Sequence, residues 1–346
     1  MPRLSRRLLL ATALAAGTLG SPAVLAQAET PVKFQLDWRF EGPAAFFLLP
    51  AAKGYFKAEK LNVTIDSGNG SSNAVNRVAS GAYDMGFADM AALMEFHANN
   101  PTAPNKPVAV MMVYNNTPAA VFSLKKTGIR SPADLTGKKL GAPVFDAGRR
   151  AFPIFAKANK VGEVNWVSMD PPLRETMLAK GDVDAITGFY FTSLLSLEAR
   201  GVRAAEVAVM PYPSYGVKLY GNAIIVGEDF LKKNPEAVKA FLRAFAKGAK
   251  EVVADPKAAV AHVKARDGII NADLEERRLR LAITVSVATE DARNETFGDL
   301  NKPRLALMAS QVADAYNTKG RINPDAVWNG SFLPPVGDRD IFAVKK

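Results

Sequence analysis

Hydrophobic and polar positions alternate over short stretches of this chain, and longer segments between them carry apolar residues every three or four positions. Alternation with a period of two predicts strands, whereas the longer spacing predicts amphipathic helices. The first part of the chain predicts strands over Val32–Leu36, Leu61–Ile65, Tyr83–Ala88 and Val108–Val113, with helices over Ala44–Phe56, from the Gly68–Ser72 turn to about Ala79, and over Met90–Ala98. This alternation predicts an α/β domain built on a parallel sheet.

The same alternation restarts further along the chain and predicts a second, smaller α/β unit between Asp134 and about Tyr215. Its strands are predicted within 137–142 and over Val164–Val167 and Val183–Ile186, and its helices over Gly148–Asn159 and Pro172–Lys180. Beyond a strand at Ala223–Val226 the pattern predicts helices over Glu228–Asn234, Pro235–Ala254, Pro256–Ala265, Ala272–Ala288 and Lys302–Asn317. Pro235 and Pro256 stand where a proline suits the first turn of a helix.

Two junctions, near Thr117-Pro118 and Gly221-Asn222, separate these patterns. We therefore expect one discontinuous lobe made of residues 31–118 and 222–346, and a second lobe made of residues 119–221. Two lobes joined by two crossings form a hinged clamshell, a geometry suited to closing around a ligand.

Residues 1–26 are predicted to be a cleavable signal peptide. Arginines precede an uncharged apolar run, Leu8–Ala16, which is too short to span a bilayer, and Val24–Ala26 supplies small residues for cleavage. The adjacent Arg6 and Arg7 fit general secretion and twin-arginine export equally well. The mature protein is therefore expected outside the cytoplasm.

Composition narrows the chemistry. The chain has 44 Lys and Arg against 34 Asp and Glu, a formal net charge of +10, and this excess is scattered, which favours a solvated basic surface over nucleic-acid binding. The absence of cysteine excludes disulfides, thiolate nucleophiles and a lipid-attachment cysteine. His97 and His262 lie far apart, so we expect no metal site and no cofactor. No later apolar run has the length of a membrane span, so we expect no membrane insertion.

Short motifs along the chain carry a resemblance to a known family. They are Leu36-Asp37-Trp38, Ala52-Lys53-Gly54-Tyr55-Phe56 followed by Leu61-Asn62-Val63, Gly81-Ala82-Tyr83-Asp84-Met85-Gly86, Asp134-Leu135-Thr136-Gly137-Lys138, and Gly181-Asp182-Val183-Asp184-Ala185. In this order they resemble type II periplasmic substrate-binding proteins of ABC importers. More narrowly, they resemble the group that includes nitrate, sulfonate and taurine binders and binders of thiamine pyrimidine precursors.

The resemblance covers about Lys33 to Pro256. It implies a type II periplasmic-binding-protein-like α/β fold, with two lobes joined by a two-crossing hinge and extra C-terminal helices. It also implies a monomer that captures a small-molecule ligand in the periplasm and delivers it to an ABC permease and its ATPase, without covalent chemistry. A sensory module that presents its loaded form to a receptor would have the same sequence features.

Ligands of open α/β sheets bind beyond the carboxyl ends of the strands. This rule predicts ligand-binding residues independently of the family resemblance. Asp37 and Trp38 follow the first strand, where Trp38 offers a flat face to an aromatic or cationic solute or simply packs in a turn. Gly70, Ser71 and Ser72 enter a helix, where they suit an anion or carbonyl oxygen, or where Ser71 acts as an N-cap.

Further candidates follow the other strands. Asp89 faces the cleft or caps its own helix, and Tyr114 ends the strand Val108–Val113. In the second lobe Asp146 accepts from a ligand amine or caps its helix, and the Gly148 backbone permits close approach. Phe189 and Tyr190 close on the face opposite Trp38 or pack within their lobe.

The candidate cleft is rich in aromatic rings and carboxylates. Such a site suits a nitrogenous aromatic solute, such as a thiamine pyrimidine precursor, because rings stack and carboxylates accept from ring amines. An organosulfonate, taurine or nitrate-type anion is the alternative, since Gly70-Ser71-Ser72 and Arg149 would serve it. A eukaryotic pyrimidine synthase related to this fold uses a cysteine-rich motif and a histidine. The missing cysteine disfavours an enzyme.

Overall fold

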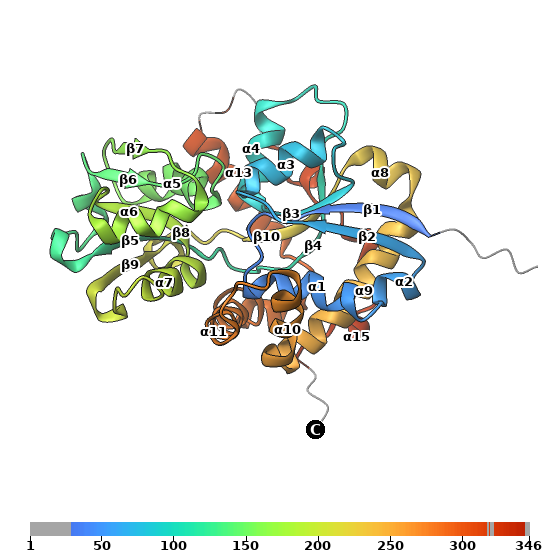
Figure 1. Cartoon of the computed structure of the whole chain (residues 1–346). Helices are drawn as coiled ribbons and strands as arrows, with labels where there is room; N and C mark the ends of the chain where they lie inside the picture. The colour runs from blue at the N-terminus through green and yellow to red at the C-terminus, as the bar shows by residue number, and fades with distance from the viewer. Residues whose placement is uncertain (1–28, 317, 319–321, 343–346) are drawn as a thin grey trace, which may run out of the picture.

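Two separate five-stranded sheets organise the computed structural model, which describes residues 29–316, 318 and 322–342 (Figure 1). The first sheet has the order β2-β1-β3-β10-β4, with β2 at Leu61–Asp66, β1 at Thr30–Gln35, β3 at Met85–Asp89, β10 at Asn222–Val226 and β4 at Val108–Met112. The second has the order β7-β6-β8-β5-β9, with β7 at Asn165–Val167, β6 at Lys139–Gly141, β8 at Ala185–Phe189, β5 at Ala119–Leu124 and β9 at Val207–Pro211. The predicted signal peptide, residues 1–26, lies outside the described residues.

The first sheet is mixed, which corrects the predicted parallel sheet. Strands β1, β2 and β3 are parallel, but β10 runs antiparallel between β3 and β4, with Asn222 opposite Asp89 and Val226 opposite Met85. The reason is the route of the chain. It returns from the second sheet at the edge where β3 ends, so β10 has to enter the first sheet from that edge and run in the opposite direction.

The second sheet contains two strands, β5 and β9, that the sequence pattern did not predict. Strand β5 is antiparallel to both β8 and β9, while β6 pairs in parallel with β7 and β8. All six residues of β5 are buried. A strand covered on both faces shows a continuous apolar run instead of alternation, which is why the period-two pattern is absent there.

Helices cover both sheets. Those of the first part of the chain are α1 (Ala45–Ala52), α2 (Tyr55–Ala58), α3 (Ser71–Ala79) and α4 (Met90–Asn99), and those attached to the second sheet are α5 (Ala147–Ala158), α6 (Arg174–Lys180) and α7 (Tyr190–Glu198). The C-terminal ones are α8 (Glu228–Lys233), α9 (Pro235–Ala254), α10 (Pro256–Arg266), α11 (Ala272–Ala282), α12 (Glu290–Glu295), α13 (Lys302–Tyr316), α14 (Pro324–Val327) and α15 (Val336–Arg339). Helices α9 and α10 begin at the predicted prolines. No helix in the described part of the chain combines the length and apolar character needed to cross a membrane.

The C-terminal helices return to pack on earlier ones. Helices α9 and α10 contact α1, so that aromatic rings such as Phe34, Phe47, Phe241 and Phe245 form one core beside the first sheet. Helix α13 contacts both α4 and α5, and α11 contacts α7, so C-terminal helices touch elements of both sheets (Figure 1). The predicted helix Ala272–Ala288 is α11 followed by a π-helical turn at Ile283–Val287.

The chain passes from the first sheet to the second between β4 and β5, and returns between β9 and β10. These two passages bring the carboxyl ends of strands from both sheets toward one another. The limits of the lobes, 31–118 with 222–346 and 119–221, stay a prediction.

Candidate ligand-binding site

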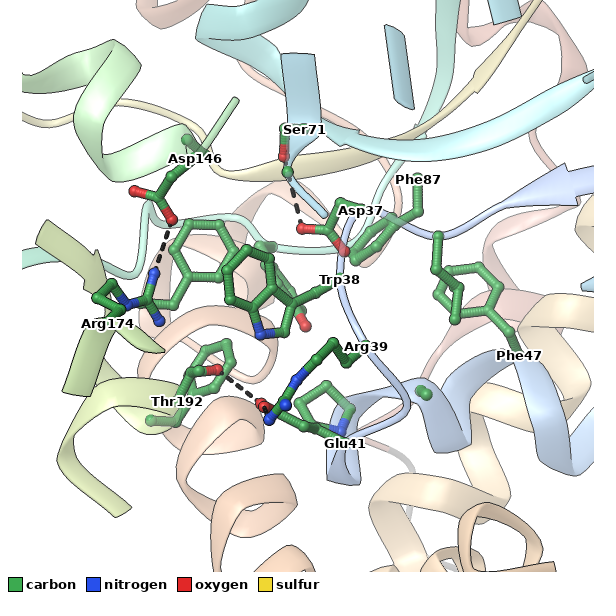
Figure 2. Close-up of a pocket in the computed structure, with 18 residues that line it drawn as sticks. Asp37, Trp38, Arg39, Glu41, Phe47, Ser71, Phe87, Asp146, Arg174 and Thr192 are labelled. Atoms are coloured by element: carbon green, nitrogen blue, oxygen red, sulfur yellow. Dashed lines mark hydrogen bonds and ion pairs between the residues drawn. The ribbon is translucent and has the colours of Figure 1, made fainter. Parts of the chain in front are cut away.

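A pocket lies where strand ends from the two sheets meet (Figure 2). It is lined by Leu36, Asp37, Trp38, Arg39, Glu41, Pro43, Ala44, Phe47, Gly70, Ser71, Phe87, Tyr114, Asp146, Ala147, Arg174, Phe189, Phe191 and Thr192. The lining combines rings, carboxylates and two arginines. The pocket therefore offers stacking surfaces, hydrogen-bond acceptors and donors at once.

Trp38 comes directly after β1 and presents an unused donor. Its Nε1 is buried and has no hydrogen-bond partner in the described residues. The guanidinium carbon of Arg174 lies 4.9 Å from the centre of the indole, which places a cation over the ring. A buried N–H without a partner costs free energy, so Trp38 is set up to donate to a bound molecule.

Asp37 is buried beside it and is anchored on two sides. Its Oδ2 accepts from Asn222 Nδ2 at 2.7 Å. Ser71 Oγ lies 3.5 Å from the same oxygen (Figure 2). Burial raises the pKa of Asp37 to about 7, although the hydrogen bond from Asn222 opposes this shift. Near neutral pH this carboxyl group can therefore either accept a hydrogen bond or donate one.

Asp146, Arg174 and Glu175 form a buried ionic cluster on the side of the second sheet. Arg174 Nη1 donates to Asp146 Oδ2 at 2.9 Å (Figure 2). Arg174 Nε donates to Glu175 Oε1 at 2.8 Å. Burial raises the pKa of Asp146, and the charge of Arg174 opposes that rise. Asp146 Oδ1 also accepts from the Arg149 backbone N–H, so this residue caps α5 and lines the pocket.

A second polar cluster joins the loop after Trp38 to α7. Thr192 Oγ1 donates to Glu41 Oε2 at 3.0 Å, and Arg278 Nη1 of α11 lies 3.4 Å from the same oxygen. Burial favours a raised pKa for Glu41, but the charges of Arg278 and Arg39 outweigh it and hold the pKa below its ordinary value. Glu41 is therefore a charged acceptor at this wall.

Aromatic rings from both sheets complete the pocket. Tyr114 packs edge-on against Phe87, Phe189 and Phe191, with ring centres 5.1, 6.4 and 5.8 Å apart. Phe47 packs on Phe87 at 5.0 Å. These pairs hold the rings in fixed orientations, so the apolar part of the pocket is preformed.

Most residues predicted from the sequence come together in this pocket: Asp37, Trp38, Gly70, Ser71, Tyr114, Asp146 and Phe189 line it. Asp89, by contrast, caps α4, where its Oδ1 accepts from the backbone N–H groups of Ala91 and Ala92. Ser72 lines a neighbouring groove with Phe145.

Gly148 and Tyr190 also lie outside the lining. Gly148 sits within the first turn of α5, where its carbonyl accepts from the Tyr212 hydroxyl at 2.8 Å. Tyr190 begins α7, and its backbone N–H donates to the Pro118 carbonyl at 2.7 Å.

Sequence reasoning missed four polar residues of the lining: Arg39, Glu41, Arg174 and Thr192. A signal for Arg174 was present. The strand-end rule, applied to β7, points to the loop after it and to the helix start at Arg174. Arg39 and Glu41 lie in the same loop as the predicted Trp38. Thr192 lies three residues after the end of β8, close in sequence to the predicted Phe189 and Tyr190.

Neither histidine contributes to the pocket, and in the described residues no group of three or more His, Asp or Glu side chains is arranged to hold a metal ion. Comparison with known proteins bears on the same region. A family model described as NMT1/THI5 like matches residues 44–259, which include most of the pocket. The chain belongs to the NMT1/THI5-like family.

Proteins similar in sequence to this chain are named for different functions. The 4-amino-5-hydroxymethyl-2-methylpyrimidine phosphate synthase of Aspergillus parasiticus is 28% identical over 243 residues, which cover 66% of this chain and 68% of that protein. The riboflavin-binding protein RibY of Chloroflexus aurantiacus is 27% identical over 213 residues, which cover 61% and 59%. One relative is thus named as an enzyme and the other as a binding protein.

Solved structures identify the fold. The alkanesulfonate-binding protein SsuA of Xanthomonas axonopodis pv. citri, bound to MOPS, aligns with a TM-score of 0.68 at 12% identity over 88% of this chain and 99% of that one. The periplasmic aliphatic sulphonate-binding protein SsuA of Escherichia coli aligns with a TM-score of 0.67 at 12% identity, over 89% and 95%. The predicted type II periplasmic-binding-protein fold is therefore confirmed.

Proposed function

We propose that this protein is the periplasmic solute-binding component of an ABC importer, and that it captures a nitrogenous aromatic solute such as an aminopyrimidine. The observation that carries the proposal is that one pocket contains both an unused donor, the Trp38 Nε1–H, and the Asp37 carboxyl group, between walls of aromatic rings. A ring nitrogen can accept from the indole, while an exocyclic amine donates to the carboxylate. The aromatic walls supply stacking.

The charge of the pocket favours this solute over an oxyanion. Asp37, Glu41 and Asp146 line the pocket together with Arg39 and Arg174; Glu41 is held ionised, while burial raises the pKa values of Asp37 and Asp146. Arg39 is half exposed and Arg174 is already paired with carboxylates. A sulfonate or nitrate would have to approach acidic side chains at short range.

The transport role rests on the fold and on the predicted signal peptide. Structures of the same fold are named as periplasmic binding proteins. Closure of two lobes about a ligand gives a permease a loaded form that it can recognise. We therefore propose that a membrane permease and its ATPase receive the solute.

A catalytic role is the second candidate, because the Aspergillus relative is named as a synthase. We favour binding without turnover, since the pocket lining has no histidine and the chain has no cysteine. Nucleophilic or acid–base chemistry would have to rely on Asp37, Glu41 or Asp146. Each of these carboxylates is already held by hydrogen bonds.

A ligand panel tests the proposal. Aminopyrimidines, taurine, alkanesulfonates and nitrate are added to the purified protein, and the melting temperature and Trp38 fluorescence are followed. We expect an aminopyrimidine to raise the melting temperature in a concentration-dependent way, because ligand binds only the folded state. A response to oxyanions alone refutes the solute class. Conversion of the added compound, detected by mass spectrometry, refutes the binding role.

A further inference from the structure

The pocket contains two features that ordinarily attract anions. Arg174 lies in its wall, and α3 begins at Ser71, so the positive end of a helix dipole points toward it. Guanidinium groups and helix N-termini are common partners of sulfonates and phosphates. What surrounds Arg174 therefore decides whether the pocket accepts an anion.

Two carboxylates occupy the guanidinium of Arg174. Nη1 donates to Asp146 Oδ2 at 2.9 Å, while Nε and Nη2 both lie 2.8 Å from Glu175 Oε1. Glu175 is not part of the pocket lining, and Ser193 Oγ fixes it from behind with a hydrogen bond of 2.8 Å to the same oxygen. Arg174, Glu175 and Asp146 are 1%, 3% and 4% exposed. Solvent screens these charges little.

The charges of this cluster do not favour an incoming anion. Two carboxylates and one guanidinium leave a formal excess of negative charge beside the pocket. Even when Asp146 takes up a proton, Glu175 alone balances Arg174. An oxyanion would therefore meet a cation whose charge is already neutralised, in surroundings where electrostatic interactions are strong.

We propose that Glu175 is a specificity-determining residue that makes the pocket reject oxyanions by neutralising Arg174 from outside the lining. Glu175 does not touch the ligand; it acts through Arg174, which does line the pocket. This inference rests on the proposed function, since it explains how the site discriminates against sulfonates and nitrate.

A purely structural role for Glu175 predicts something different. If the carboxylate only anchors Arg174 and Ser193, its removal lowers the free energy of unfolding and weakens every ligand alike. A specificity role predicts tighter binding of anions with no such gain for neutral aromatics. The diagnostic quantity is therefore the ratio of affinities for an anion and for a neutral aromatic, and not either affinity alone.

The experiment measures the binding of methanesulfonate and of cytosine by calorimetry to the wild type, Glu175→Gln, Asp146→Asn and Ser193→Ala. Glutamine keeps the shape of Glu175 and an acceptor for Arg174 but removes the charge. We expect Glu175→Gln to bind methanesulfonate about tenfold or more tightly than the wild type, without a parallel gain for cytosine. Asp146→Asn removes the other carboxylate and should change the ratio in the same direction. Ser193→Ala, which removes a hydrogen bond and no charge, should leave it unchanged.

The outcomes separate this inference from the proposed function. Cytosine binding by the wild type, with no gain of methanesulfonate binding in either carboxylate variant, overturns the role of Glu175 and leaves the function standing. A gain of methanesulfonate binding, with no aminopyrimidine bound by the wild type, supports the role of Glu175 and refutes the solute class. Wild-type binding of methanesulfonate as tight as that of Glu175→Gln also overturns the inference.

Discussion

Asp37 shows how a single residue couples the pocket to pH. Its carboxyl group is buried next to Asn222, and burial raises its pKa to about 7. In the unfolded chain the same group titrates near the ordinary value of 3.8. Between these two values the folded protein holds a proton that the unfolded chain has released. The free energy of unfolding must therefore fall as the pH rises through this window and level off above it.

Replacing Asp37 with asparagine should remove this dependence. The wild type is expected to lose up to about 1.4 kcal/mol of stability for each pH unit between about pH 4 and pH 7 from this group, whereas Asp37→Asn cannot titrate. Urea unfolding across this range checks it: the variant should gain stability relative to the wild type as the pH rises. Asp89, whose pKa burial also raises to about 7, is present in both proteins and largely cancels.

Asp134 supplies a control of opposite sign. Hydrogen bonds from the backbone N–H groups of Arg130 and Ser131 lower its pKa, so its ionised form contributes stability above the ordinary pKa and loses it in acid. Asp134→Asn should therefore lose stability relative to the wild type as the pH rises from acid toward the ordinary value of 3.8, and the difference should stay constant above it. An Asp37→Asn curve parallel to that of the wild type would contradict the buried, protonated carboxyl group.

Individual site residues could be predicted where they lie in the loop after a strand. Asp37, Trp38 and Asp146 were found in this way and line the pocket. Asp89 is the last residue of β3, but its carboxylate caps α4, an outcome that sequence left open because both roles use the same residue type at the same place. The ion pairs of Arg174 could not be predicted. Asp146 lies 28 residues before it and Glu175 is the next residue, and only the fold brings the three side chains together.

At the scale of elements, the pocket depends on how closely the N-terminus of α3 approaches the loop before α5. Gly70 precedes α3 with a φ of +144°, and a Cβ built there would lie 2.2 Å from the Phe145 carbonyl oxygen. Gly70 N also donates to the Asp37 carbonyl at 2.7 Å. The absence of a side chain at Gly70 therefore lets two loops, one from each sheet, meet at the pocket wall.

Gly70→Ala should force these loops apart. We expect about tenfold or greater loss of ligand affinity, together with a lower melting temperature, because overpacking against backbone costs about 1–3 kcal/mol. Gly81→Ala is the matched control: Gly81 has a φ of +75°, but a Cβ there would have no neighbour within 4 Å. It should lower the melting temperature through backbone strain while leaving affinity unchanged. Equal affinity losses in both variants would mean that the approach at Gly70 does not shape the pocket.

The pattern of elements could be predicted well where a strand has one covered face or a helix has clear ends. Pro235 and Pro256 marked helix starts that the structure has. The buried strand β5 gave no alternation, and β10 gave no sign of its direction, because direction follows from where the chain re-enters the sheet. The π-helical turn at Ile283–Val287 was predicted as plain helix, since apolar spacing does not distinguish the two.

For the whole molecule, a buried cation takes part in the contact between α11 and α7. Arg278 Nη1 donates to the Thr192 carbonyl at 2.6 Å and to the Phe191 carbonyl at 3.2 Å, and Nε donates to Glu275 Oε2 at 2.9 Å. Arg278 is only 2% exposed. Because polar groups regain hydration when they separate, we expect such contacts to lower the cost of parting the two predicted lobes.

Arg278→Met tests this view of the molecule. The change removes the buried cation that Glu41 and Glu275 share and leaves Glu41 only the half-exposed Arg39, which costs about 3–5 kcal/mol as long as α7 stays against α11. Separation of the two helices admits water and relieves that cost. We therefore expect the ligand-free variant to have a larger radius of gyration in small-angle X-ray scattering, and to bind ligand at least about tenfold more weakly.

Arg277→Met is the matched neighbour. Arg277 pairs with Glu198 across the same two helices at 2.5 and 2.9 Å, but both side chains are exposed, and exposed pairs contribute less than about 1 kcal/mol. The Arg277→Met variant should match the wild type in radius of gyration and in ligand affinity. If Arg278→Met lowers the melting temperature at an unchanged radius and affinity, the buried cluster stabilises the fold without governing closure. Expansion of the Arg278→Met variant alone would mean that the buried charges around Arg278 hold the two predicted lobes together.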